Sequence, residues 1–200
     1  MSAVLAPTKM SAQEYLAWED AQDERHEYVD GEIVAMVGVR INHNLICTNA
    51  FAAFRQPLKG GPCAVFMIDL RLRVDAVNAY FYPDMAVTRT PSDLADGRAL
   101  EIKAPWLVLE VLSDSTAARD RGIKLEAYRK IASLTHYLLV DATRVHIDLY
   151  VKNARGVWEL HTLTGQDTLQ FEQPHAFELP VAAFYEDVVF APPATSAQGH

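Results

Sequence analysis

Cysteine is scarce in this sequence, with only Cys47 and Cys63 among 200 residues. Two cysteines exclude a disulfide-built scaffold and a zinc site made of several cysteines, and they favour a reducing compartment. The chain also lacks an apolar run long enough to span a bilayer. No basic residue precedes the short apolar stretch at 3–6, so a signal peptide is not expected either. We therefore expect a cytoplasmic protein with no membrane segment.

The composition is that of a folded domain. Half of the residues are hydrophobic and 22% are charged, which is enough apolar surface to bury a core. Two hundred residues are close to the length of one large domain, and no linker divides them. We expect a single domain over residues 1–190. Residues 191–200, with two prolines and small polar side chains, should form a loose tail.

Acidic residues outnumber basic ones by 26 to 18, which gives a net charge of −8. This charge argues against a nucleic acid partner, but its distribution is uneven. Eight of the acids lie between Glu14 and Glu32, where Arg25 is the one base, and no lysine or arginine follows Arg155. Because the local field depends on how charges are arranged, the middle of the chain can still present a positive face.

Periodicity and turn residues predict a mixed α/β order. Ser11 and Glu14 fit a capping box that opens a short helix, and Asp30-Gly31 should join strands 26–29 and 32–37 in a hairpin. The other predicted elements are a helix at 42–55, strands at 64–74, 84–88 and 106–112, a helix at 116–132, and strands at 136–140, 144–151 and 157–163. The prediction is an α/β fold with a mixed central sheet flanked by helices, preceded by an N-terminal helix and hairpin.

Two acids occupy unusual places in the predicted strands. Asp84 opens one strand, and Glu110 interrupts the most hydrophobic strand of the chain, where a charge needs a partner or a metal. If the two strands are neighbours, both carboxylates meet at one sheet edge, and a hard divalent cation such as Mg²⁺ or Mn²⁺ would relieve their repulsion. The alternative is that Asp84 caps a turn and Glu110 pairs with a base such as Lys124.

Lys124 lies on the helix predicted after Glu110, four residues beyond Asp120. This spacing fits an ordinary surface ion pair, worth about 0.3–0.5 kcal/mol. It also fits a lysine turned toward a metal site, where its ammonium would orient a water or stabilise developing negative charge. Spacing alone leaves both interpretations open.

Other reactive side chains have simpler explanations. His43 should make a structural hydrogen bond, since no two histidines have the spacing of a zinc motif. Ser113 and Ser115 are better candidates for helix capping than for nucleophiles, because no nucleophile-elbow motif surrounds them. Tyr128 and Tyr137 should pack in the core and hydrogen-bond through their hydroxyl groups.

The acids and the lysine lie in four stretches that occur in a fixed order: HEYVDGEIVAM, PDMAV, LVLEVLSDST and RDRGIKLEAY. In this order, and on these predicted elements, they resemble the Uma-type family of putative restriction endonucleases, a branch of the PD-(D/E)xK nuclease superfamily. The resemblance extends from about Ser11 to Leu163. It implies a restriction-endonuclease-like fold for the single domain.

The resemblance also implies roles for individual residues. Asp84 and Glu110 match two metal ligands, and the carbonyl of Val111 would be a third. Leu112 stands where the superfamily pattern has lysine, and Lys124 from the following helix would take that place. Glu27 matches an N-terminal acid that completes the metal shell or holds a water.

The activity implied is Mg²⁺-dependent (or Mn²⁺-dependent) hydrolysis of DNA phosphodiester bonds, with a homodimer as a further expectation because two sites cut two strands. One alternative is a catalytically degenerate domain that serves as a binding or scaffold module. Another is a metal-dependent hydrolase of small phosphoesters. The salt dependence of binding distinguishes a polymer substrate from a small one. Binding to a polymer weakens steeply as salt rises, because counterions are released, whereas binding of a small substrate does not.

Overall fold

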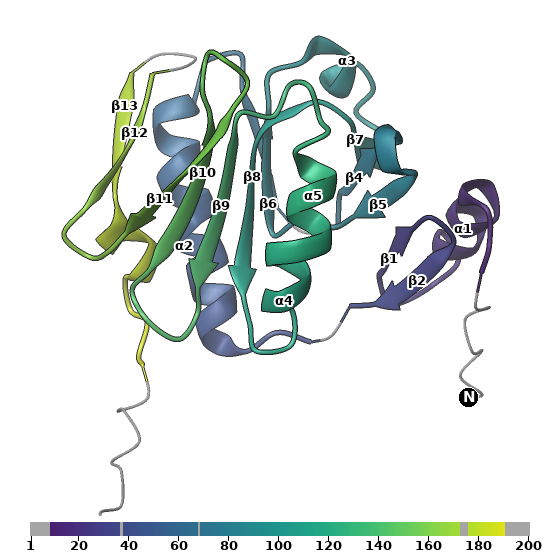
Figure 1. Cartoon of the computed structure of the whole chain (residues 1–200), viewed down its shortest axis with the longest axis horizontal. Helices are drawn as coiled ribbons and strands as arrows, with labels where there is room; N and C mark the ends of the chain where they lie inside the picture. Colours follow the sequence, from purple (N-terminus) through teal and green to yellow (C-terminus); the bar gives the residue numbers. More distant parts are fainter. Residues whose placement is uncertain (1–8, 37, 68, 173–175, 191–200) are drawn as a thin grey trace, which may run out of the picture.

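A six-stranded sheet forms the centre of the computed structural model, which describes residues 9–36, 38–67, 69–172 and 176–190. The strands lie in the order β11-β10-β9-β8-β6-β3 (Figure 1). Strands β8 and β9 are parallel, and their neighbours pair antiparallel, so the predicted mixed sheet is confirmed. The bounds are β3 Ala64–Met67, β6 Met85–Thr88, β8 Pro105–Leu112, β9 His136–Asp141, β10 Ile147–Lys152 and β11 Trp158–Leu163.

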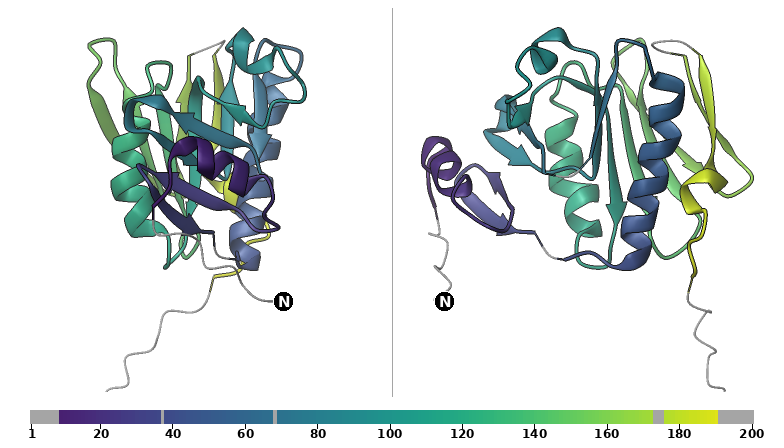
Figure 2. Two further views of the ribbon diagram at one scale, coloured as in Figure 1. Left: turned by 90° about the vertical axis from the view of Figure 1, so that its right-hand side faces the viewer. Right: turned by 180° about the vertical axis from the view of Figure 1, so that it is seen from behind.

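Helical segments cover both faces of this sheet (Figures 1 and 2). Strand β8 is buried along its whole length, as its hydrophobicity predicts. Its residues Leu107 and Leu109 pack with one helix, whereas Val108 and Leu112 pack on the opposite face. Because side chains alternate along a strand, Glu110 points to that second face. The first helix is α2 (Ile41–Leu58); the second face is covered by α4 (Ala117–Arg119), the π-helical η2 (Asp120–Lys124) and α5 (Leu125–Tyr128).

A second sheet has five strands in the order β2-β1-β5-β4-β7. The prediction of one strand over residues 64–74 is wrong, because β3 belongs to the central sheet and β4 to this one. Between them Asp69 adopts a left-handed conformation with φ of 62°, which interrupts an extended chain. The bounds are β1 His26–Val29, β2 Glu32–Ala35, β4 Arg71–Val74, β5 Ala79–Phe81 and β7 Glu101–Ile102.

The N-terminal helix α1 (Ala12–Glu19) begins with the predicted capping box, in which Ser11 and Glu14 bond reciprocally. Three tyrosines, Tyr15, Tyr28 and Tyr80, form a small core between α1, β1 and β5. Since Tyr28 occupies one face of β1, its neighbour Glu27 faces the opposite side. The predicted hairpin is confirmed at residues 26–35; position 37 lies outside the described residues.

Several short elements are not predicted by the sequence. The hairpin β12 (Thr168–Phe171) and β13 (Phe177–Pro180) and the turn η3 (Val181–Tyr185) pack against α2, where the rings of Phe54 and Phe184 meet. The others are η1 (Asp75–Val77), β5 (Ala79–Phe81), α3 (Pro91–Leu94) and β7 (Glu101–Ile102). None of the helices in the described part of the chain combines the length and hydropathy that crossing a bilayer requires. The predicted tail, residues 191–200, lies outside that part.

Candidate active site

Strands β6 and β8 are neighbours, with Met85 opposite Leu109, so Asp84 lies beside the end of β8 that carries Glu110. The Oδ2 atom of Asp84 accepts a hydrogen bond from the backbone N–H of Val111 at 2.6 Å. Both backbone groups of Val111 face the β6 side of the strand, where β6 has already ended. The predicted meeting of the two acids at one sheet edge is therefore found, and the carbonyl of Val111 faces the same edge.

Lys124 lies at the centre of a group of carboxylates. Its Nζ atom is 2.8 Å from Oε1 of Glu27, 3.1 Å from Oε1 of Glu110 and 3.1 Å from Oδ1 of Asp120. All four side chains are buried. The Glu110–Lys124 pair considered as an alternative does form. The Asp120–Lys124 pair also forms, but it is buried, so of the two interpretations that the spacing leaves open the surface pair is excluded.

Asp120 and Lys124 are the first and last residues of the π-helical turn η2. A π-turn is wider than an α-turn, and such turns occur mostly as single-turn bulges inside α-helices, frequently at functional sites. Here it directs two charged residues into the protein between β8 and β1. Among the described residues, Oδ1 of Asp120 is buried without a hydrogen bond, although it lies close to Lys124. The helix predicted over 116–132 contains no sequence signal for this turn.

Glu27 contacts two cationic side chains, Lys124 and Arg119. Its Oε1 faces Lys124, and its Oε2 accepts a hydrogen bond from Nε of Arg119 at 2.7 Å. Within the described residues the Nη2 atom of Arg119 is buried and has no hydrogen-bond partner. Arg119 is therefore held in place by Glu27, and its Nη2 group is enclosed by the protein. The sequence did not single out Arg119 as a site residue.

Burial and neighbouring charges shift the pKa values of the residues in this cluster. Burial raises the pKa of Glu110 well above its ordinary value, and the acids around it add to the rise, while Lys124 opposes it. Burial alone would lower the pKa of Lys124, but the charges of Glu110 and its neighbours raise it well above the usual range. Tyr128 donates to Oε1 of Glu110 at 2.8 Å, the hydroxyl contact that the sequence predicts for this core tyrosine. The lysine therefore stays charged inside an acidic cluster.

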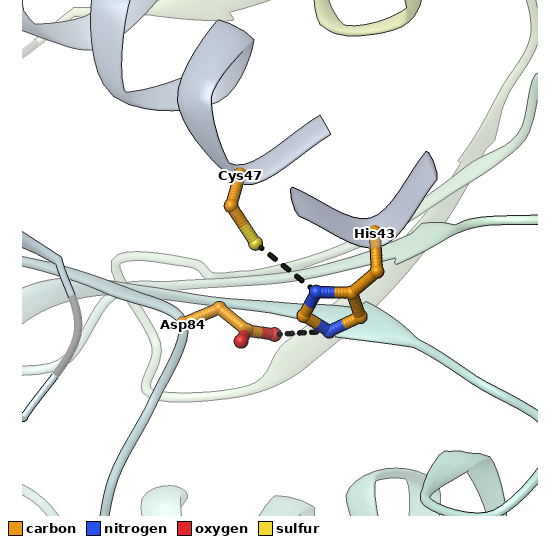
Figure 3. Close-up of side chains that lie close together, drawn as sticks. All are labelled: His43, Cys47 and Asp84. Atoms are coloured by element: carbon orange, nitrogen blue, oxygen red, sulfur yellow. Dashed lines mark hydrogen bonds and ion pairs between the residues drawn. The ribbon is translucent and has the colours of Figure 1, made fainter. Parts of the chain in front are cut away.

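On the other face of the sheet edge, α2 places His43 against Asp84. The Nε2 atom of His43 is 3.3 Å from Oδ2 of Asp84, and its Nδ1 atom is 3.5 Å from Sγ of Cys47 (Figure 3). Burial alone would lower the pKa of His43, but the hydrogen bond and charge of Asp84 raise it overall. His43 is thus part of the site; the signal that could have found it is its spacing of four residues from Cys47, which puts both on one helix face.

A pocket of about 200 Å³ lies at this end of the sheet. The acidic side chains, Lys124, Arg119 and His43 line its polar side, and apolar side chains line the rest. A larger hollow of about 320 Å³ lies elsewhere, beside Arg73 and Lys130, and contains none of the site residues. The pocket is lined on its polar side by Glu27, His43, Asp84, Glu110, Arg119, Asp120 and Lys124, and on its rim by Val34, Met36 and Val39.

The donor set suits a hard divalent cation. The carboxylates of Glu27, Glu110 and Asp120 surround Lys124, and Asp84 lines the same pocket. Lys124 and Arg119 neutralise only part of this negative charge. Carboxylate and carbonyl oxygens are the ligands that Mg²⁺ and Mn²⁺ prefer. The residues therefore fit such an ion.

The fold and this constellation define a restriction-endonuclease-like domain. The family model Uma2, described as "Putative restriction endonuclease", matches residues 12–182. The chain belongs to this family, which confirms the resemblance seen in the sequence.

Two relatives are known from Synechocystis sp., each named "Uncharacterized protein". The chain is 42% identical to slr1290 over 164 residues, which cover 82% of this chain and 85% of that protein. It is 33% identical to sll1609 over 165 residues, covering 82% and 93%. A crystal structure titled as a putative nuclease belonging to DUF820, from Anabaena variabilis, matches with a TM-score of 0.72 over 90% of this chain and 99% of that one. At 15% identity it shows a common fold.

Proposed function

We propose that this protein is a Mg²⁺-dependent or Mn²⁺-dependent endonuclease that hydrolyses phosphodiester bonds in DNA. The observation that carries the proposal is the end of two paired strands, where the partly buried Asp84 lies beside the strand that carries Glu110, and Glu110 contacts the buried Lys124. A structural ion pair would need one acid for one lysine, whereas this site gathers an excess of carboxylates beside a pocket. The family description points to the same class of activity.

Asp84, Glu110 and the carbonyl of Val111 would hold the cation. When bound, it supplies Lewis-acid polarisation of a phosphoryl oxygen and a lower pKa for a water molecule. The chain fixes these ligands in advance: the N–H of Val111 and the ring of His43 hold Asp84, and the hydroxyl of Tyr128 holds Glu110. Such support keeps ligands in their working orientation.

Two cations of the chain would act on the phosphate. Lys124 is kept protonated by its three carboxylates, so it would stabilise the negative charge that develops as water attacks phosphorus. Arg119 lines the pocket, where its positive charge would attract a phosphate oxygen and position the backbone. Glu27 would hold both cations in place instead of binding the metal directly, since each of its oxygens faces one of them.

A polymer substrate agrees with the family description of a restriction endonuclease. Cutting both strands of a duplex requires two sites, so we propose a homodimer as the working form. Both cysteines are unpaired, which agrees with a cytoplasmic location.

Cleavage of a supercoiled plasmid in Mg²⁺, with EDTA as the control, tests this proposal. We expect nicked and linear products in Mg²⁺ and none in EDTA. Raising salt from about 50 to 200 mM should weaken DNA binding roughly 40-fold if three phosphates are contacted. Hydrolysis of bis-p-nitrophenyl phosphate, a small substrate, should change little over the same range. Binding of DNA without cleavage would overturn the proposal in favour of a degenerate binding module, and salt-independent turnover of the small ester alone would favour a phosphoesterase.

A further inference from the structure

A second group of potential ligands lies on the α2 face of the sheet edge. His43 and Cys47 are one helical turn apart, and Asp84 faces them from the start of β6 (Figure 3). One nitrogen, one sulfur and one oxygen atom from these three residues lie within 4.8 Å of one another. The acid cluster around Lys124 lies on the opposite face, so Asp84 is the residue that the two groups share.

The chemistry of this group differs from that of the acid cluster. Imidazole, thiolate and carboxylate together are typical ligands of Zn²⁺, whereas Mg²⁺ avoids sulfur and rarely binds nitrogen. With one ligand atom taken from each residue, the three lie within 4.8 Å of one another, so a turn of the side chains would bring them to the spacing of ligands around one tetrahedral ion. His43 and Asp84 line the pocket, which gives an ion a route to Cys47 behind them.

We propose that His43, Cys47 and Asp84 form a binding site for Zn²⁺ or a cation of the same borderline-soft class, with the fourth position open to the pocket. The His43 ring contacts its two partners through different nitrogens, so it must turn for one nitrogen to bind the ion. Binding displaces the thiol proton of Cys47, which is released to solvent. Because binding displaces this proton, affinity increases with pH.

A cation bound at this site should also affect DNA cleavage, an expectation that rests on the proposed nuclease function. A cation on the α2 face withdraws Asp84 from the acid cluster, so Zn²⁺ should inhibit Mg²⁺-dependent cleavage. The ratio of rates with and without Zn²⁺ measures this effect within each variant. Cation binding to this site is measured without DNA or Mg²⁺. A negative result there is therefore distinguishable from an absence of nuclease activity.

Titration of the full chain with Co²⁺, a spectroscopic substitute for Zn²⁺, tests the site directly. We expect one equivalent to produce a thiolate-to-cobalt charge-transfer band. Cys47→Ser should abolish the band and weaken Co²⁺ binding at least tenfold, since even outer-shell losses cost 10-fold to 100-fold. Cys63→Ser is the matched control and should keep the band, because Cys63 lies outside the cluster.

His43→Gln gives a second variant, expected to weaken binding similarly, in case Cys47→Ser fails to fold. Circular dichroism verifies the fold of each protein. Absence of the band in the wild-type chain would overturn the proposal and leave His43 as a hydrogen-bond bridge. A band that is lost in Cys63→Ser and kept in Cys47→Ser would equally contradict it.

Discussion

Asp84→Asn and Glu110→Gln should each slow Mg²⁺-dependent DNA cleavage by about 10³-fold or more. Each substitution removes one carboxylate from the proposed cation site while preserving the shape of the side chain. Electrostatic stabilisation by a bound cation is worth several kcal/mol, and about 4 kcal/mol corresponds to a factor of 10³. Single-turnover cleavage of a labelled duplex measures the loss.

The same variants should remain folded. Neutralising one of several crowded acids relieves repulsion, so in the absence of metal each variant should unfold at the same temperature as the wild type or higher. Asp141→Asn is a matched control, because Asp141 ends the adjacent strand β9 but bonds Thr143 and Arg144 away from the pocket. It should cleave at the wild-type rate. Undiminished cleavage by both site variants would show that the site is assigned wrongly.

Lys124→Met should lower the free energy of unfolding by about 3–5 kcal/mol. The lysine is buried among Glu27, Glu110 and Asp120, and removing it leaves their charges uncompensated. Urea unfolding followed by circular dichroism measures the change. Lys130→Met is the control, since Lys130 is exposed shortly after α5 and should shift stability by less than about 0.5 kcal/mol.

The loss in Lys124→Met should depend on pH in a defined direction. Burial already raises the pKa of Glu110 and of Asp120, and removing the lysine removes the charge that lowers both values. The folded state then binds more protons than the unfolded state above the ordinary pKa of a carboxyl group, so stability falls as pH rises. The variant should therefore approach the wild type near pH 5 and fall furthest behind near pH 8. A stability difference between the variant and the wild type that does not change with pH would contradict the burial of this charged cluster.

The meeting of Asp84 and Glu110 could be predicted from the sequence. A charge inside a continuous hydrophobic strand needs a partner, and two consecutive strong strands tend to be neighbours. The hairpin at Asp30-Gly31 and the capping box at Ser11 were equally predictable, because local turn and cap chemistry determines them.

Other parts of the site depend on contacts that no local pattern encodes. The π-helical turn that contains Asp120 and Lys124 has no sequence signature, and Glu27 was identified only through the family resemblance. His43 and Cys47 have the spacing of one helical turn, but their value as ligands depends on Asp84, which is distant in sequence. The split of residues 64–74 between two sheets depends on the left-handed conformation of Asp69, which strand periodicity does not predict.

Thermal melting with Mn²⁺ tests the central claim most directly, namely that the carboxylates at the β6 and β8 strand ends hold a divalent cation. Wild type and Glu110→Gln are melted with and without Mn²⁺, in the presence of a short non-cleavable duplex that supplies phosphate oxygens. At about 100 times its Kd the cation should stabilise the wild type by about 2.7 kcal/mol, or roughly 5 °C or more in Tm. The account predicts this rise in the wild type and its loss in Glu110→Gln. An equal rise in both proteins, or no rise in either, would contradict it.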